Sequence, residues 1–249
     1  NINEDDPNAI IKLKLDSASL TMRGSFDKAI KLEEKILRLI EKRRGIDNFD
    51  FLKTLSNLGE LNLYKGDIIK AEKYLERALE NHNLYFNTNI INHDILNLYQ
   101  QISRVYILRK NYKKAEKFIE KTIGSSILLA KEQSQYLAEI DRKDFANMIL
   151  SSYETLFTII DELPSGKKLA LKARINRQGL LEDIERYQSS FSNLDNEEKE
   201  LAEEIKQLNI KLSDVLLNKE DSQKLNRKKI KLEEKLYSKL PSLKPRIIE

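Results

Sequence analysis

No proline lies between Pro7 and Pro164, and this long interval sets the strongest limit on how the chain can fold. Proline interrupts a helix more effectively than any other residue, and only 7 glycines occur among the 249 residues. The interval is rich in Leu, Ile, Glu and Lys, which suit a helix. The sequence therefore predicts an all-α protein and argues against an α/β enzyme with glycine-rich phosphate loops.

The charges of the chain almost cancel, with 44 Lys+Arg against 40 Asp+Glu and a net charge of +4. The two signs are interleaved along the chain, whereas a nucleic-acid binder usually concentrates basic residues on one face or in a tail. We therefore expect no nucleic-acid partner. No apolar run approaches the 18 or so residues that a membrane helix needs, so we also expect no membrane span.

The absence of cysteine and the presence of only 2 histidines limit the chemistry of the chain. His82 and His93 lie in an Asn-rich stretch, 81–97, which we interpret as a loop between repeats. Adjacent carboxylates such as Glu33 and Glu34 point apart on a helix, and we assign them to a solvated face. We therefore predict no catalytic residue, no metal site, no cofactor and no enzymatic activity.

Three short turn-like segments recur along the chain at nearly constant spacing. They occupy residues 24–29, 66–71 and 110–117. The alanines that follow the turns, Ala29, Ala71 and Ala115, are 42 and 44 positions apart. Because each hairpin in such an array buries its apolar face only against the next one, three aligned turns together predict a helical solenoid.

Residues 58–79 resemble the tetratricopeptide pattern of two antiparallel helices joined by a Gly-Asp turn. The spacing is similar to that of the longer-helix variant found in kinesin light chains and in many bacterial arrays. Gly59, Ala71 and Ala78 match positions where the helices approach each other closely, so a larger side chain there would push them apart. The resemblance implies about three such hairpins.

The pattern changes after the third repeat. An apolar stripe at spacings of three and four continues over 130–160 and predicts one or two capping helices. Residues 163–166 (Leu-Pro-Ser-Gly) break the helical pattern, and a new helix is expected near Lys167. We therefore predict two domains: a repeat array with its capping helices at 1–163, and a helical extension with a coiled-coil hairpin at 164–249.

The C-terminal part carries two narrow apolar seams. The first comprises Leu201, Ile205, Leu208, Leu212 and Val215, and the second comprises Leu225, Leu232, Leu236 and Leu240. Steps of four and three are typical of a coiled coil, and residues 218–222 form a good loop, so the seams predict an antiparallel coiled-coil hairpin. The first arm is acidic and the second basic, and a turn near residue 219 would place Glu203 opposite Lys235.

One segment between these parts carries a second resemblance. Residues 169–186 are similar to the segment that follows the repeats in CHAT-domain proteins, which are bacterial, common in cyanobacteria, and place tetratricopeptide repeats before a caspase-like domain. The residues that match most closely are Arg177-Gln178-Gly179-Leu180-Leu181.

This resemblance implies a caspase-like domain beyond Glu249, with a catalytic His and Cys, whereas the present chain has no cysteine. It implies that the chain recognises a partner or substrate, regulates the downstream domain and contacts it within the full-length protein. The chain starts at Asn1 and not at Met, so we interpret it as a processed or excised piece of a cytoplasmic protein. The alternative is a stand-alone adaptor or peptide sensor.

The resemblance to tetratricopeptide arrays also implies a binding face. In such arrays the first helices of the repeats line a concave face that binds peptides or helices. Alignment places these residues on that face: Lys53, Asn57, Glu60, Tyr64, Asn97, Gln100, Gln101 and Arg104. Asn, Gln and Arg at such spacing can hydrogen-bond a peptide backbone and a carboxylate, so we predict a protein or peptide partner here.

Overall fold

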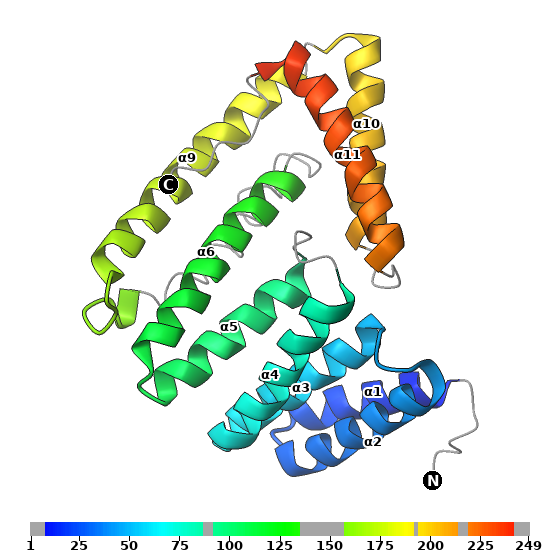
Figure 1. The fold of residues 1–249 in the computed structure, drawn as a ribbon, viewed down its shortest axis with the longest axis vertical. Helices are drawn as coiled ribbons and strands as arrows, with labels where there is room; N and C mark the ends of the chain where they lie inside the picture. Colours follow the sequence, from blue (N-terminus) through cyan, green and yellow to red (C-terminus); the bar gives the residue numbers. More distant parts are fainter. Residues whose placement is uncertain (1–7, 87–91, 135–156, 192–193, 214–218, 242–249) are drawn as a thin grey trace. The chain divides into compact units, whose positions relative to one another are not determined.

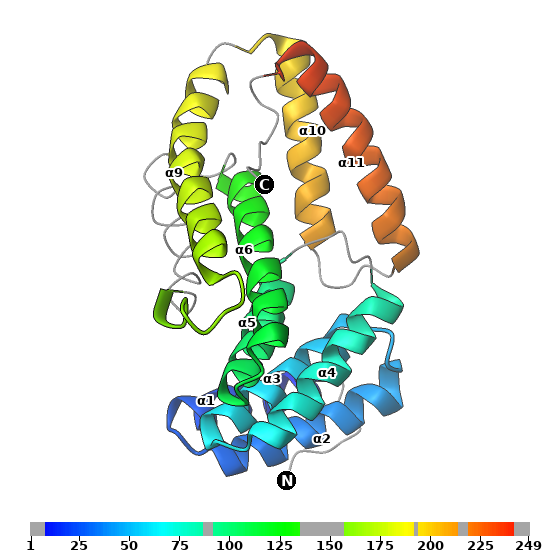
Figure 2. The same ribbon diagram turned by 60° about the vertical axis from the view of Figure 1, so that its left-hand side comes forward.

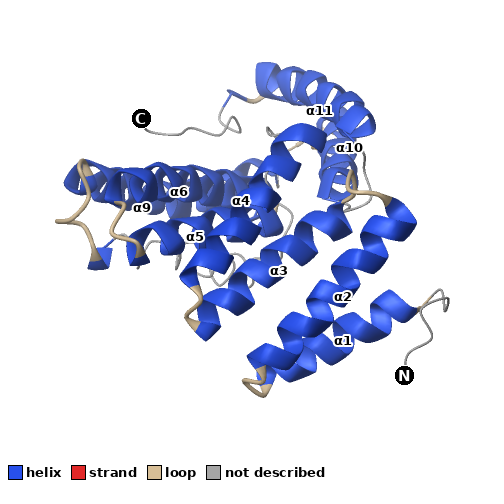
Figure 3. Ribbon diagram, turned by 60° about the horizontal axis from the view of Figure 1, so that its bottom comes forward, coloured by secondary structure: helices blue, strands red, loops and turns tan. Residues whose placement is uncertain are grey.

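The computed structural model describes residues 8–86, 92–134, 157–191, 194–213 and 219–241. In these ranges the chain forms helices and turns, and no strand occurs (Figure 1 and Figure 3). The predicted all-α fold is therefore confirmed. Residues 135–156, which hold most of the predicted capping helices, lie outside the described residues.

Contacts within the chain divide it into two compact units. The first consists of Asn1–Thr88 and Gln101–Asn111, and the second of Asn89–Gln100 and Tyr112–Glu249. The division runs through helix α5 (His93–Leu108), whose two halves belong to different units. The domain boundary expected after residue 163 stays a prediction.

Four complete helices form most of the first unit (Figure 2). They are α1 (Ala9–Met22), α2 (Phe26–Arg44), α3 (Phe49–Lys65) and α4 (Ile68–Tyr85). Each helix packs against the next one in the chain, α1 on α2, α2 on α3 and α3 on α4. Ile36, Leu55 and Leu75 are among the fully buried side chains. The first two hairpins thus share an apolar face with each other, as expected of stacked repeats.

The three predicted turns share one backbone geometry. Gly24 (φ 68°), Gly66 (φ 83°) and Lys110 (φ 57°) adopt the left-handed conformation just after a helix. In each turn the N–H of this residue donates to the carbonyl three residues earlier, and the next N–H donates to the carbonyl five residues before it. This is the Schellman pattern, which satisfies the last carbonyls of a helix. The repeat found in the sequence is therefore also a repeat of backbone hydrogen bonds.

The two helices of the middle hairpin, α3 and α4, approach each other closely at Gly59. A Cβ added to Gly59 would lie 2.4 Å from Cγ of Leu75, which is buried in α4. Ala71 and Ala78 on α4 are also fully buried. The predicted need for small side chains at these positions is confirmed, because a packed interior has no room for an added methyl group.

We expect Gly59→Ala to lower the melting temperature, although alanine has the higher helix propensity. Overpacking against Leu75 costs about 1–3 kcal/mol, whereas the gain in propensity is only about 1 kcal/mol. Gly124→Ala is the matched control, because a Cβ added to Gly124 meets no atom beyond its own helix backbone within 4 Å. Thermal unfolding followed by circular dichroism compares the two variants. A Gly59→Ala protein as stable as the parent would contradict the close approach.

In the second unit, α6 packs against α9. The helices are α6 (Tyr112–Ser134) and α9 (Gly166–Phe191). Glu116 on α6 accepts hydrogen bonds from the backbone N–H and the hydroxyl of Ser165, at 2.6 and 2.7 Å. A Cβ added to Gly166 would lie 2.0 Å from a backbone carbonyl oxygen, so this position needs glycine. The break predicted at 163–166 is confirmed, and α9 begins one residue earlier than expected.

The last two helices of the second unit, α10 and α11, pack on each other as a hairpin. They span Asn196–Ser213 and Lys219–Lys239. Their buried core consists of Leu194, Leu201, Ala202, Ile205 and Leu236. Three of these belong to the predicted seams, while Leu194 and Ala202 were not predicted. The packed hairpin is therefore confirmed, and its coiled-coil geometry stays a prediction.

Ion pairs across this hairpin set an antiparallel register. Glu197 lies 2.9 Å from Nζ of Lys235, and Glu204 lies 2.7 Å from Nζ of Lys228. Both pairs are symmetric about position 216, whereas the predicted pairing of Glu203 with Lys235 requires a turn near residue 219. That pairing is wrong, since Glu203 instead contacts residues on its own helix.

The register differs because the predicted loop lies too late in the chain. Residues 219–222 form the first turn of α11, and residue 218 lies outside the described residues. Asp221 suits this turn, because a carboxylate is favoured near the positive end of the helix dipole. Polar residues that look like a loop in sequence are here a helix N-terminus.

Glu197 should make the stability of this hairpin depend on pH. Hydrogen bonds from Lys239 and Lys235, with their positive charges, lower the pKa of Glu197 from 4.5 to about 2. A lowered pKa stabilises the fold at pH values above the unfolded-state pKa, and this contribution disappears as the pH falls from about 4.5 to about 2. We expect Glu197→Gln to melt about a degree below the parent at pH 7, because an exposed ion pair contributes little. At pH 2 the two proteins should have the same melting temperature.

Glu200→Gln is the control for this measurement. It removes the same charge from α10, and no ion pair of Glu200 occurs in the described part of the chain. The effect of this variant should not follow the titration of Glu197. A gap between parent and Glu197→Gln that stays constant from pH 7 to pH 2 would contradict the assigned ion pairs.

Candidate functional site

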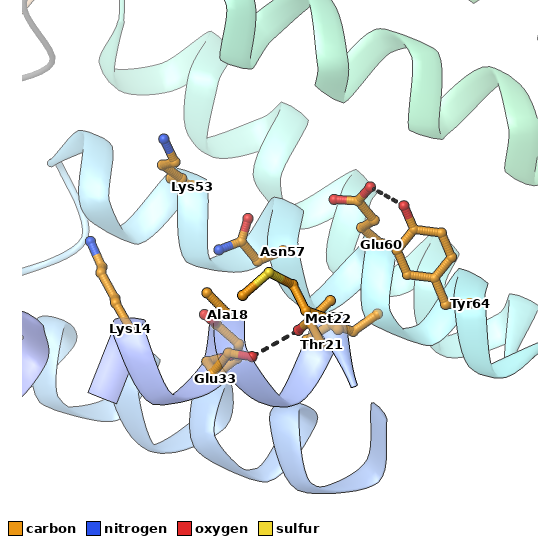
Figure 4. Close-up of a pocket in the computed structure, with 11 residues that line it drawn as sticks. Lys14, Ala18, Thr21, Met22, Glu33, Lys53, Asn57, Glu60 and Tyr64 are labelled. Atoms are coloured by element: carbon orange, nitrogen blue, oxygen red, sulfur yellow. Dashed lines mark hydrogen bonds between the residues drawn. The ribbon is translucent and has the colours of Figure 1, made fainter. Parts of the chain in front are cut away.

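A pocket of about 410 Å³ opens in the first unit between the first helices of two consecutive hairpins. It is lined from α1 by Lys14, Ser17, Ala18, Thr21 and Met22, from α2 by Glu33, and from α3 by Lys53, Asn57, Glu60, Leu61 and Tyr64 (Figure 4). We call the first helix of each hairpin (α1, α3 and α5) an A helix and the second (α2, α4 and α6) a B helix. The pocket thus belongs mainly to the A helices.

The four residues predicted on α3 all line this pocket. Lys53, Asn57, Glu60 and Tyr64 follow one another along α3 in Figure 4. Their spacing of four, three and four residues keeps them on one side of the helix, while Leu55 lies on the buried side. The sequence alignment therefore identified a real surface hollow, and its role in binding stays a prediction.

Tyr64 links this side of α3 to α5. Its hydroxyl donates a hydrogen bond of 2.7 Å to Oε1 of Glu60, drawn as a dashed line in Figure 4. This bond is the main reason why the pKa of Tyr64 is raised, and the nearby Arg104 acts in the opposite direction. The ring of Tyr64 also stacks on Phe26, with 5.5 Å between ring centroids. Tyr64 is therefore held in place at one end of the pocket.

The four residues predicted on α5 do not share one environment. Asn97 and Gln100 belong to the second unit, exposed and half-buried respectively, and Arg104 is exposed in the first unit. Gln101 is buried, and its amide has no hydrogen-bond partner among the described residues. Its predicted place on an open surface is wrong, because α5 is covered on most sides and leaves only the strip through residues 97, 100 and 104 open.

The corresponding side of α1 was not predicted from the sequence, although the repeat spacing of 42 residues identifies it. A shift of 42 positions maps the α3 residues Lys53, Asn57, Glu60 and Tyr64 onto Ile11, Leu15, Ala18 and Met22. Ile11, Leu15 and Met22 are 58%, 67% and 83% exposed. The shift of 44 positions to the third repeat maps Tyr64 onto Leu108, which is also exposed. Exposed aliphatic side chains thus recur at aligned positions of the A helices.

We call this surface of the first unit the helix-A face. It comprises Ile11, Leu15, Ala18, Met22, Lys53, Asn57, Glu60, Tyr64, Arg104 and Leu108. It is apolar along α1, polar along α3, and mixed on α5. A surface of this kind can bury apolar side chains and hydrogen-bond a partner's backbone.

Glu33 is the most unexpected residue of the pocket. The sequence placed it on a solvated face, but the structure buries it, with 4% of the residue exposed. Ala29, Ile36 and Ile40 form the buried stripe of α2 at the spacing that also includes Glu33, and this signal was available in the sequence. Burial raises the pKa of the Glu33 carboxyl, and hydrogen bonds from the side chains of Ser17 and Asn57 oppose the rise.

The two histidines take positions other than the predicted loop. His82 lies inside α4, where it is buried and stacks on Phe86, with 6.3 Å between ring centroids. His93 is the first residue of α5. Among the described residues, no group of three or more His, Asp or Glu is placed to hold a metal ion. None of the described helices has the length and apolar character needed to cross a membrane.

A second hollow, of about 480 Å³, lies between the B helices α2 and α4. Its tyrosine, Tyr74, donates a hydrogen bond of 3.2 Å to Glu34, and Arg77 lies 3.7 Å from Glu41. These contacts connect one hairpin to the next. The charged groups there therefore have a role in packing the repeats.

Residues 17–83 match the family model of the tetratricopeptide repeat. This part of the chain is a tetratricopeptide-repeat region. It runs from the middle of α1 into α4 and includes the lining residues of the pocket except Lys14. Tetratricopeptide repeats indicate a protein–protein interaction module, and an all-helical repeat of this kind is typically non-enzymatic.

The chain is also similar, at low sequence identity, to proteins of known structure. BtubC (BKLC) from P. vanneervenii is 15% identical, with a TM-score of 0.44, over 76% of this chain and 85% of that one. Repeats described as kinesin light chain TPR-like repeats from Podosopora anserina are 14% identical, with a TM-score of 0.41, over 76% of this chain and 100% of that one. No curated protein matches the chain.

The buried amide of Gln101 generates a prediction about stability. We expect Gln101→Met to raise the free energy of unfolding by about 1–2 kcal/mol, because a buried polar group without a partner is replaced by an apolar side chain of similar size. Asn97→Met, on the exposed strip of the same helix, should change it by less than about 0.5 kcal/mol. Urea unfolding of the three proteins measures both values. A destabilised Gln101→Met protein would show that the amide makes a hydrogen bond that matters.

Proposed function

We propose that this chain binds a peptide or helix of a protein partner on its helix-A face. The observation that carries the proposal is the pocket between α1 and α3. Its lining residues except Lys14 belong to the tetratricopeptide-repeat region, and they include all four α3 residues predicted from the repeat alignment. The exposed apolar residues of α1 support it, since they lie at the aligned positions. Burial of exposed aliphatic groups is the main driving force for association of proteins.

The proposal extends to a role in a larger protein. The segment at 169–186 resembles the one that follows the repeats in CHAT-domain proteins, and it lies within α9. On this basis the chain is the recognition arm that regulates a caspase-like domain and contacts it in the full-length protein. Reading the gene past the codon for Glu249 tests this part: a His-Cys protease domain would support it. A stop codon there, or an unrelated domain, would favour the stand-alone adaptor.

A nucleic-acid partner fits the charges of the structure less well. Three basic residues of α11 contact the acidic arm α10, with Lys235 and Lys239 on Glu197 and Lys228 on Glu204. Lysines that are neutralised within the hairpin release few counterions on binding a phosphate backbone, so little affinity is gained. We therefore keep a protein partner as the proposal.

Two paired substitutions test the helix-A face. Leu15→Ser with Arg104→Ala removes one exposed apolar and one exposed basic side chain from it. Ile69→Ser with Arg38→Ala makes the same two chemical changes on the B helices, where Ile69 is 76% exposed. We expect the first variant to weaken partner binding at least tenfold, because contacts of this type dominate interfaces, and the second to leave it unchanged.

The partner for this measurement is first isolated by pull-down with mass spectrometry, and its affinity is then measured by titration calorimetry. Both variants should melt within a degree or two of the parent, because all four side chains are exposed. Equal loss of affinity in both variants would contradict a specific role for the helix-A face. Loss in the control alone would move the site to the B helices.

A further inference from the structure

The first hairpin differs from the second at its closest packing contact. The shift of 42 positions that aligns the repeats maps Gly59 and Leu75 onto Ser17 and Glu33. In the middle hairpin this contact is apolar and tight, with Leu75 filling the space above Gly59. In the first hairpin a buried carboxyl takes the place of the leucine, and Ser17 hydrogen-bonds to it.

The third repeat has an apolar residue at the position that corresponds to Leu75. The shift of 44 positions maps Leu75 onto Ile119, which is buried. Packing alone therefore does not require a carboxyl at this position of the repeat. A buried charge is usually no more stabilising than an apolar side chain of similar volume, and often less. Glu33 thus carries a cost that the repeat fold avoids in its other copies.

The position of the Glu33 carboxyl indicates a functional reason for burying it. Glu33 lines the 410 Å³ pocket, and its Oε2 atom is buried without a hydrogen-bond partner among the described residues. Ala18, Met22 and Leu61 contribute apolar wall to the same pocket. A site with apolar walls and one unsatisfied carboxylate oxygen is complementary to an apolar stem that ends in a hydrogen-bond donor with positive charge.

The other charged groups of the pocket already have partners. Lys14 forms an ion pair with Asp50, and its positive charge also acts on Glu33. Glu60 accepts a hydrogen bond from Tyr64. Lys53 stands exposed at the rim. Ser17, Asn57 and Lys14 compensate the Glu33 carboxyl only in part, because burial still raises its pKa and its Oε2 atom has no hydrogen-bond partner among the described residues. A neutral or acidic ligand group would leave this oxygen unsatisfied in a partly desolvated place.

We propose that this pocket binds a basic side chain of the partner peptide, an arginine, with its guanidinium on Glu33 and its methylene groups against Ala18, Met22 and Leu61. The proposal rests on the proposed function and adds the chemical class of the anchor residue. Arginine fits better than lysine, because a guanidinium is more weakly hydrated than an ammonium group and loses less on entering a partly apolar site.

The site can be tested with small probes before any partner is known. The probe is n-butylguanidinium, which has the stem and head group of arginine, and its matched neutral control is n-butylurea. Both are titrated into the 249-residue chain and followed by two-dimensional ¹H–¹⁵N NMR. We expect saturable shifts of amide signals from residues that line the pocket with n-butylguanidinium, and none that saturate with n-butylurea.

Two substitutions assign the binding to Glu33. Glu33→Leu places the residue of the middle repeat in the first one, so we expect an equal or higher melting temperature together with at least tenfold weaker binding of n-butylguanidinium. Ala18→Phe fills the pocket from an exposed position of α1 and leaves Glu33 in place, and it should abolish binding with an unchanged melting temperature.

Several results would overturn the inference. These are no saturable binding of n-butylguanidinium to the parent, equal binding of n-butylurea, or undiminished binding by Glu33→Leu. A Glu33→Leu protein that melts well below the parent would show that the carboxyl serves packing, and this would also overturn it.

Failure here can be separated from failure of the proposed function. If the helix-A face variant Leu15→Ser with Arg104→Ala loses partner binding while Glu33→Leu retains it, the face is correct and the arginine anchor is wrong. If neither variant affects the partner, the proposed function itself fails, whatever the small probe shows.

Discussion

The tetratricopeptide-repeat region depends on how closely the two helices of a hairpin can approach. In the middle hairpin this approach is set by Gly59, which leaves just enough space for the side chain of Leu75. The Schellman turn at Gly66 fixes the direction of the chain between α3 and α4. The contact at Gly59 and this turn together determine the shape of the hairpin. The same turn occurs at Gly24 and Lys110, and in the first unit α1 to α4 pack on one another in chain order.

Regular stacking also makes departures from the repeat visible. The helix-A face is made of aligned positions that the fold leaves exposed or half-buried, so their chemistry is free to vary between repeats. It varies from Ile11, Leu15 and Met22 on α1 to Lys53 and Asn57 on α3. Glu33 is a departure of another kind, because it replaces a core residue and brings a carboxyl into the pocket. Both departures occur around the same hollow, and this is the reason to place recognition there.

The hairpin of α10 and α11 follows a different principle. Its described core contains Leu194, Leu201, Ala202, Ile205 and Leu236, with Leu232, Tyr237 and Leu240 packed against it, and charge also takes part in choosing its register. Glu197 and Glu204 face lysines of the opposite arm, and both pairs are centred on position 216. Each exposed pair adds little stability, but a shifted register would break them together.

The sequence by itself determined the helical class, the three turns, the break before α9 and the α3 residues of the pocket. These follow from local chemistry, because proline, glycine and the spacing of apolar residues act within a few residues of their own position. Tertiary structure decided the rest. It buried Gln101 and His82, moved the turn of the last hairpin, and placed Glu33 beside Asn57. Burial and pairing depend on which helices surround a residue, and a single helix does not contain that information.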